Sequence, residues 1–145
     1  MKISTKGRYA IRMMLDLAMH AEDEYIPLND IAERQGISKK YLEQIVPVLN
    51  SAGFLKTNRG YRGGYMLRKA PECYTAGEIL RCTEGSLAPV LCAEQSPPDC
   101  PRAQSCMTLP LWRGLYKAVE DYLDSVTLRD LIEEYTERGA NDYVI

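Results

Sequence analysis

The sequence predicts a mainly α-helical fold that contains one small β-hairpin. Two short stretches with helical spacing lie on either side of Gly36, which is typical of a helix-turn-helix. Two alternating runs then flank a basic, glycine-rich centre, which is typical of a hairpin. Near the C-terminus, a long apolar stripe repeats at helical spacing. A helix-turn-helix followed directly by a basic hairpin is a winged helix, so we expect a winged helix-turn-helix with a long C-terminal helix.

Caps and apolar faces predict the N-terminal helices. Ser4 or Thr5 can cap the first helix, which runs to about residue 21 and whose apolar residues recur at helical spacing. A second, short helix ends at Gly36, which can adopt the left-handed conformation that closes a helix. Ser38 caps a third helix that runs to about residue 52 and presents one apolar face. We therefore place the helix-turn-helix at about residues 28–51.

The wing is predicted at about residues 54–68. Alternating apolar residues surround three glycines there, and such glycines permit a tight hairpin turn. Pro71 ends this unit because proline restricts the preceding residue. The winged helix-turn-helix DNA-binding domain is therefore expected to span residues 1–70.

The remainder of the chain divides into two segments. In residues 71–107, Thr75 and Glu78 form a capping box that opens a small helix, and a proline-rich loop follows. In residues 108–145, a long helix over about 108–125 carries the apolar stripe. A second capping box then opens a final helix, which we expect to end near Tyr135.

Charge is unevenly distributed along the chain. Its 145 residues carry a net charge of −2. Residues 1–70 hold 12 Lys and Arg against 7 Asp and Glu, whereas residues 71–145 hold 6 against 13. A basic half joined to an acidic half indicates that one part faces a polyanion, although a chance asymmetry of solvated surface is the alternative.

The sequence shows no targeting or membrane-spanning pattern. No run approaches the roughly 18 apolar residues of a membrane span. Arg12 and Asp16 interrupt the most apolar early stretch, which excludes a signal peptide. We expect a cytoplasmic protein with no membrane partner.

The start of the third helix is the expected site of base reading in a double-stranded DNA operator. A recognition helix places its N-terminal residues near base edges in the major groove. Lysines there can reach phosphate or guanine, Gln44 can pair with adenine, and Glu43 can accept from cytosine. Glu43 is equally well explained as a surface charge that stabilises the helix. The expected contacts are Ser38, Lys39, Lys40, Tyr41, Glu43 and Gln44.

The wing supplies a second set of expected DNA contacts. Arginine can insert into a narrow minor groove, and neighbouring glycines let the backbone approach DNA. The expected wing contacts are Arg59, Gly60, Tyr61 and Arg62. The alternative is that these cations are ordinary solvated charges on a small domain.

The apolar stripe on the long helix predicts a homodimer. The N-terminal unit already has apolar faces with which to fold, so a large stripe near the C-terminus is available to a second copy. DNA readers of this kind bind two half-sites across a two-fold axis. Packing of the stripe against its own domain is the alternative. The stripe contains Leu109, Trp112, Leu115, Tyr116, Val119, Tyr122, Leu123 and Val126.

Three of the five cysteines lie close together in the proline-rich loop. Cys92, Cys100 and Cys106 are surrounded by polar residues and prolines that offer almost nothing to a core. A metal or cluster can supply the folding energy that such a loop lacks. Thiolates favour zinc or iron–sulfur clusters, and the absence of a Cys-x-x-Cys pair disfavours a zinc knuckle. Redox-active thiols are a further alternative. Cys82 is expected to be a buried small hydrophobe, and Cys73 is ambiguous.

Seven motifs together resemble the IscR family, whose relatives include CymR and NsrR. The resemblance runs over nearly the whole chain. It implies a dimeric winged-helix regulator that responds to an iron–sulfur cluster, to nitric oxide or, in cluster-free members, to cysteine metabolism. The motifs are Ser-Thr-Lys-Gly-Arg-Tyr-Ala at 4–10, Ile-Ala-Glu-Arg-Gln-Gly-Ile-Ser at 31–38, Tyr-Leu-Glu-Gln at 41–44, Arg-Gly at 59–60, Gly-Gly-Tyr at 63–65, Thr-Ala-Gly-Glu-Ile at 75–79 and Leu-Trp at 111–112.

The resemblance implies that the three loop cysteines are cluster ligands, with one ligand left open. IscR-like members have a histidine three residues after the last cysteine, where this chain has Leu109. NsrR-like members have an acidic residue near the N-terminus, where this chain has Arg8. A 2Fe–2S cluster is favoured over a 4Fe–4S cluster. The candidates for the fourth ligand are Glu94, Asp99, Cys73, Cys82, a residue of a partner chain and an external thiol.

Three functions compete as explanations of these residues. The first is a transcriptional regulator, a repressor, that senses iron–sulfur or redox status through the cysteine loop. The second is a cluster-free, CymR-like regulator of cysteine and sulfur metabolism, controlled by a partner protein or by thiol oxidation. The third, a small redox or iron–sulfur enzyme, lacks a nucleophile–base pair, a phosphate loop and a nicotinamide fingerprint. We expect a regulator rather than an enzyme.

Overall fold

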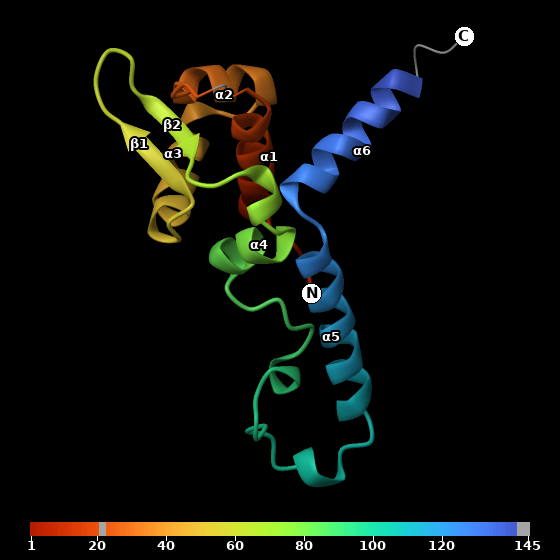
Figure 1. The fold of residues 1–145 in the computed structure, drawn as a ribbon. Helices are drawn as coiled ribbons and strands as arrows, with labels where there is room; N and C mark the ends of the chain where they lie inside the picture. Colours follow the sequence, from red (N-terminus) through yellow and green to blue (C-terminus); the bar gives the residue numbers. More distant parts are fainter. Residues whose placement is uncertain (21–22, 142–145) are drawn as a thin grey trace.

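The computed structural model describes residues 1–20 and 23–141, and Figure 1 shows its arrangement. Within these residues, six α-helices and one two-stranded antiparallel sheet confirm the predicted mainly α-helical fold with a hairpin. The elements are α1 (Thr5–His20), α2 (Leu28–Gln35), α3 (Lys39–Ser51), β1 (Leu55–Asn58), β2 (Gly64–Leu67), α4 (Ala76–Glu84), α5 (Leu109–Ser125) and α6 (Leu128–Asn141).

The helix-turn-helix forms for the local reasons that its sequence indicates. Gly36 closes α2 with a φ of 62°, in the left-handed region. The Ser38 hydroxyl accepts a hydrogen bond from the Tyr41 backbone N–H at 3.2 Å and so caps α3. The first helix is capped in the same way, because the Ser4 hydroxyl accepts from the Gly7 N–H at 3.2 Å. The apolar faces of α1, α2 and α3 meet in one core.

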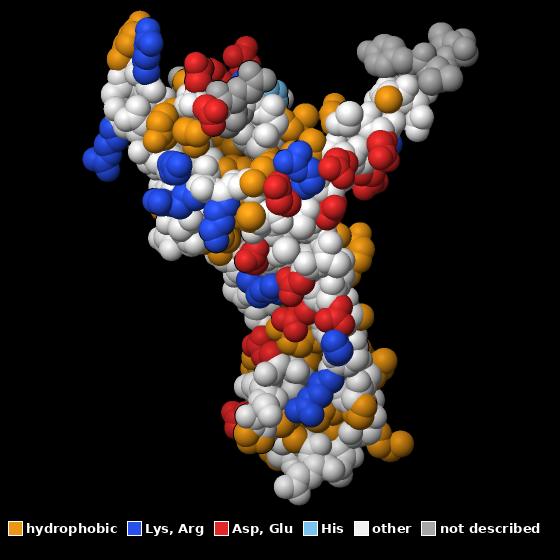
Figure 2. All heavy atoms as spheres, viewed as in Figure 1, with side chains coloured by type: hydrophobic (Ala, Val, Ile, Leu, Met, Phe, Trp, Pro, Cys, Tyr) orange, Lys and Arg blue, Asp and Glu red, His pale blue; other side chains and the backbone are white. Residues whose placement is uncertain are grey.

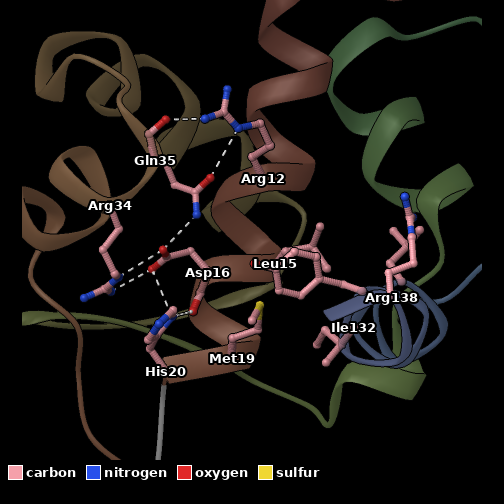
Figure 3. A pocket seen from close by; sticks show the side chains of 11 residues that line it. Arg12, Leu15, Asp16, Met19, His20, Arg34, Gln35, Ile132 and Arg138 are labelled. Carbon is pink, nitrogen blue, oxygen red and sulfur yellow. Dashed lines mark hydrogen bonds and ion pairs between the residues drawn. The ribbon is translucent and has the colours of Figure 1, made fainter. Parts of the chain in front are cut away.

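A buried carboxylate ties α1 to α2 (Figure 3). Asp16 lies on α1, and its side chain is fully buried. It accepts hydrogen bonds from Arg34 Nε at 3.1 Å, from Arg34 Nη2 at 2.7 Å and from Gln35 Nε2 at 2.9 Å. The hydrogen bond to this carboxylate is the largest contribution that raises the pKa of the Arg34 guanidinium. Arg12 donates in turn to Gln35, so one polar network fixes the helix-turn-helix against α1.

The hairpin is anchored to the segment that precedes α2. β1 and β2 pair from Leu55 opposite Leu67 to Asn58 opposite Gly64. Ile26 forms an isolated bridge with Tyr65 through two backbone hydrogen bonds of 2.9 Å. A side chain on Gly64 would overlap the carbonyl group of Ile26, so this close approach requires glycine.

The C-terminal half agrees with the predicted capping boxes and differs in the length of one helix. Thr75 and Glu78 cap α4 reciprocally, and Thr127 and Asp130 do the same for α6. The predicted end of the last helix near Tyr135 is wrong, because α6 continues to Asn141. Its exposed last turns need no apolar face, and an ion pair between residues 134 and 138 supports them at i,i+4 spacing. The sequence also suggests frayed residues from 139 to 145, but residues 139–141 belong to α6, and residues 142–145 lie outside the described residues.

The predicted apolar stripe of α5 divides into two faces. Trp112, Tyr116 and Val119 are half-buried on the side of α5 that packs on its own chain. Leu115 and Tyr122 are exposed, as is Leu111. Part of the stripe therefore packs within the protomer, as the alternative interpretation expected, and part does not. None of the helices in the described ranges combines the length and apolar character needed to cross a membrane.

Candidate nucleic-acid interface and cysteine loop

The first turns of α3 present most of the predicted base-reading residues to solvent. Lys39, Lys40, Glu43 and Gln44 are exposed, and so is the capping residue Ser38. Pairing of this helix with α2 through the turn at Gly36 leaves its N-terminal end uncovered. A lysine-rich helix N-terminus that points outward suits a polyanion, because the helix dipole and the charges act in the same direction.

Tyr41 differs from its predicted neighbours on α3. Its side chain is half-buried, and its ring packs edge-on against Tyr9 with the centroids 5.3 Å apart. Arg12 lies over the same Tyr9 ring at 5.2 Å from its centroid. Tyr41 therefore contributes packing between α3 and α1, which the sequence pattern alone did not distinguish from a base contact.

The wing and the recognition helix enclose one hollow. A depression of about 460 Å³ is lined by Lys39 and Glu43 from α3 and by Arg59 from the wing. Predicted residues that lie far apart in the sequence are thus brought together. At the wing tip, Tyr61 is fully exposed and Gly60 has a φ of 112°, so the turn depends on glycine there. Arg62 is also exposed.

Four polar residues of this hollow were missed by the sequence analysis. Asn29, Asn50, Thr57 and Asn58 line it together with the predicted cations. The Thr57 hydroxyl donates to Asn50 Oδ1 at 3.3 Å, which joins β1 to the C-terminal part of α3. The sequence offered one weak signal, the three asparagines of this set, and asparagine is common in any loop.

The charge distribution follows the predicted division of the chain. Figure 2 shows Lys and Arg side chains gathered over the hairpin, whereas Asp and Glu side chains mix with them along α5 and cluster at the base of α6. The four predicted cations of the wing and helix are exposed and have no acidic partner among the ion pairs of the described residues; they are Lys39, Lys40, Arg59 and Arg62. This side of the molecule is the one suited to a phosphate backbone.

The cysteine loop lies at the end of α5 farthest from the wing (Figure 1). It contains two short 3-10 turns, Leu91–Ala93 and Ala103–Ser105. Cys92 and Cys106 are half-buried, and Cys100 is exposed. Across residues 1–20 and 23–141, no three His, Cys, Asp or Glu side chains are close enough to hold a metal ion. The three predicted ligands therefore share one loop without meeting at a point.

The donor atoms of this loop are thiol sulfurs, which suit a soft metal centre. Three thiols lie on a segment with little apolar content, and the Thr108 side chain, 3.5 Å from Cys106 Sγ, is the main cause of a lowered pKa of that thiol. Cys100 and Leu109 line the same hollow of about 440 Å³. Leu109, in the position of the expected histidine, is thus beside the loop but offers no donor atom.

The two other cysteines are separated from this loop. Cys82 on α4 is half-buried against the core, and its Sγ donates to the Ile79 carbonyl at 3.0 Å. Burial raises the pKa of its thiol, which agrees with the predicted role as a small hydrophobe. Cys73 is exposed in a short 3-10 turn before α4.

A winged helix-turn-helix with an exposed basic recognition face defines a DNA-binding protein. The model of the Rrf2 family, described as an iron-dependent transcriptional regulator, matches residues 3–134. The chain belongs to the Rrf2 family of transcriptional regulators and is not an enzyme.

Individual relatives agree with this assignment. The chain is 41% identical over 134 residues to protein rrf2 of Nitratidesulfovibrio vulgaris, which covers 92% of this chain and 89% of the relative. Its structure is similar to CymR, the global cysteine regulator of B. subtilis, with a TM-score of 0.76 and 40% identity over 92% of this chain and 98% of the other. It is similar to T. potens IscR with a TM-score of 0.75 and 38% identity over 95% and 90%.

Proposed function

We propose that the chain is a homodimeric repressor that binds a double-stranded operator through α3 and the wing. The observation that carries this proposal is the hollow in which Lys39, Glu43 and Arg59 converge from two elements. In this arrangement α3 enters the major groove, and the wing arginines reach the adjacent backbone or minor groove. A regulator that acts on DNA in this way works in the cytoplasm.

Operator binding is tested with Arg59→Ala. If Arg59 neutralises a phosphate, the variant binds more weakly, and the slope of log affinity against log salt decreases by about 1. Arg138→Ala is the matched control, because Arg138 is an exposed arginine that pairs with Glu134 on its own helix, α6. Equal affinity and equal salt slope for wild type and Arg59→Ala would remove Arg59 from the interface.

The exposed face of α5 supports the homodimer. Leu111, Leu115, Ala118 and Tyr122 are exposed at spacings of four, three and four residues, the heptad pattern of a helix–helix seam. Two copies joined along this face would present two recognition helices to two half-sites. Leu115→Glu is expected to give monomers in sedimentation analysis, whereas Lys117→Gln on the same helix remains dimeric. Wild-type protein that sediments as a monomer would exclude this interface.

We propose that Cys92, Cys100 and Cys106 hold an iron–sulfur cluster, 2Fe–2S rather than 4Fe–4S. The thiol donors, the weakly packed loop and the lowered pKa of the Cys106 thiol support this assignment. When bound, the cluster is a group whose occupancy depends on iron supply and on oxidants. A change in its occupancy can alter the position of α5, because the loop leads directly into this helix.

The cluster is tested by anaerobic purification with measurement of iron, sulfide and visible absorption. We expect a coloured protein with iron and sulfide, and a Cys92→Ala variant that loses both. Ser105→Ala is the control, since it alters the same loop and leaves every thiol in place. A colourless protein without iron that still binds DNA would replace the cluster with the second candidate function.

That second candidate is a cluster-free regulator of cysteine metabolism. Two observations favour it, the similarity to CymR and the apolar Leu109 in place of a fourth ligand. In this case a partner protein or oxidation of the loop thiols controls DNA binding. It predicts that an oxidant changes operator affinity in iron-free protein, and that replacing Cys106 with serine abolishes the change.

A further inference from the structure

The segment between the wing and α4 is bonded to the wing by one side chain. Tyr74 lies in this segment and is 2% exposed. Its hydroxyl accepts a hydrogen bond from the Lys69 N–H at 2.9 Å and donates one to the Phe54 carbonyl at 3.1 Å. Phe54 directly precedes β1 and Lys69 follows β2, so the phenol closes the open end of the hairpin.

Packing and protonation keep this hydroxyl in place. The Tyr74 ring packs edge-on against the Phe54 ring, with the centroids 5.4 Å apart and an angle of 76°. Burial raises the pKa of the Tyr74 hydroxyl, so the group is protonated and able to donate at neutral pH.

The backbone of the same segment is bonded to the corner between α5 and α6. The Leu128 N–H donates to the Tyr74 carbonyl at 3.0 Å, and the Ala76 N–H donates to the Val126 carbonyl at 2.8 Å. Thr75 and Thr127 thus form an isolated antiparallel bridge between the two segments. Since α5 ends at Ser125, a change in the direction of α5 acts first on this pair.

The cysteine loop lies at the opposite end of α5 (Figure 1). The helix has 17 residues, which corresponds to about 25 Å of continuous helical rod. A packed helix moves as a unit, so a displacement at the loop end reaches the corner. The contacts of Tyr74 then continue from the corner to the base of the wing.

We propose that Tyr74 is a positioning residue that couples the α5–α6 corner to the orientation of the wing. One residue joins the two regions, because its backbone holds the corner and its side chain holds the hairpin. The effect on DNA rests on the proposed function, whereas the coupling itself does not. Its consequence is that the state of the cysteine loop sets the position of the wing arginines.

The coupling is tested in the DNA-free protein by amide hydrogen exchange of the hairpin and of α5. Tyr74→Phe removes the hydroxyl and keeps the ring, and the Phe54 carbonyl retains its hydrogen bond from the Arg68 N–H. Ala76→Pro removes the bond to Val126 at the first position of α4, where proline is tolerated. Tyr135→Phe, which removes a hydroxyl from an exposed tyrosine of α6, is the control.

We expect Tyr74→Phe to increase exchange of the hairpin amides about 10- to 100-fold, because the variant loses the two hydrogen bonds of the hydroxyl and each corresponds to a factor of about three to ten. Ala76→Pro is expected to increase exchange in the hairpin as well, although it alters only the corner. Exchange in α5 stays at the wild-type rate in Tyr74→Phe. Unchanged hairpin exchange in either variant overturns the coupling, as does an equal increase in the hairpin and α5.

Operator affinity separates this inference from the proposed function. Both variants are expected to bind a wild-type operator severalfold more weakly, with Tyr135→Phe equal to wild type. Wild-type protein without affinity for any operator would refute the proposed function, and hairpin exchange would still decide the coupling. Faster exchange of the hairpin amides together with unaltered operator affinity would overturn the role of Tyr74 in DNA binding.

Discussion

Replacing the buried carboxylate between α1 and α2 is expected to destabilise the DNA-binding domain. Asp16→Asn keeps the shape of the side chain but removes its charge and turns one acceptor oxygen into a donor. That donor faces the guanidinium of Arg34 and the amide of Gln35, which are donors themselves. The variant therefore leaves a buried polar group without a suitable partner.

The magnitude follows from the burial of the two partners. Breaking a buried ion pair costs about 3–5 kcal/mol when the remaining charge stays buried. The Arg34 side chain is 35% exposed, so it regains water when its partner loses charge. A single hydrogen bond to a charged group contributes about 1.5–3 kcal/mol. We expect Asp16→Asn to lower the free energy of unfolding by about 2–3 kcal/mol.

The control has the same contact distance in an exposed setting. Lys117 and Asp121 approach to 2.7 Å, as Arg34 and Asp16 do, but their side chains are 75% and 64% exposed. Asp121→Asn should change stability far less than Asp16→Asn, because solvent screens an exposed pair. Urea unfolding followed by circular dichroism measures both, at one fixed protein concentration because the proposed dimer would make stability depend on concentration. Equal small losses in the two variants would refute the argument from burial.

Three further substitutions test local features of the fold. Asp130→Asn should lower the melting temperature at pH 7. The difference from wild type should shrink as pH falls from about 5 toward 2, because the hydrogen bond from the Thr127 backbone lowers the pKa of the Asp130 carboxyl and its contribution is lost on protonation. A difference in melting temperature that grows in acid would contradict this. Gly64→Ala should cost about 1–3 kcal/mol in urea unfolding, because its new methyl group overlaps the Ile26 carbonyl; wild-type stability would show that the hairpin can move aside. Ser38→Ala should cost about 1 kcal/mol through the lost cap of α3, with Ser51→Ala at the other end of the helix as a neutral control.

The elements that carry the proposed DNA interface could be predicted because their signals are local. Caps, the glycine between α2 and α3 and the glycine-rich wing are determined by neighbours within a few positions, so sequence spacing identifies the elements and their exposed ends. The same spacing could not separate Tyr41, which packs on Tyr9, from the exposed positions around it. Nor could it identify Asn50 or Thr57, whose place beside Arg59 depends on how the hairpin folds back.

By itself the sequence determined the order of the helices, the wing, the capping boxes and the charge difference between the two halves, because each depends on short-range backbone preferences and composition. Only the tertiary structure decided which face of α5 stays exposed, what satisfies Asp16, and that Tyr74 joins the wing to the α5–α6 corner. These features pair residues such as 16 with 34 and 74 with 128, and long-range pairs of this kind leave no periodic trace in the chain. Their partners are fixed by the packing of the whole core, in which a buried polar group must find a hydrogen bond.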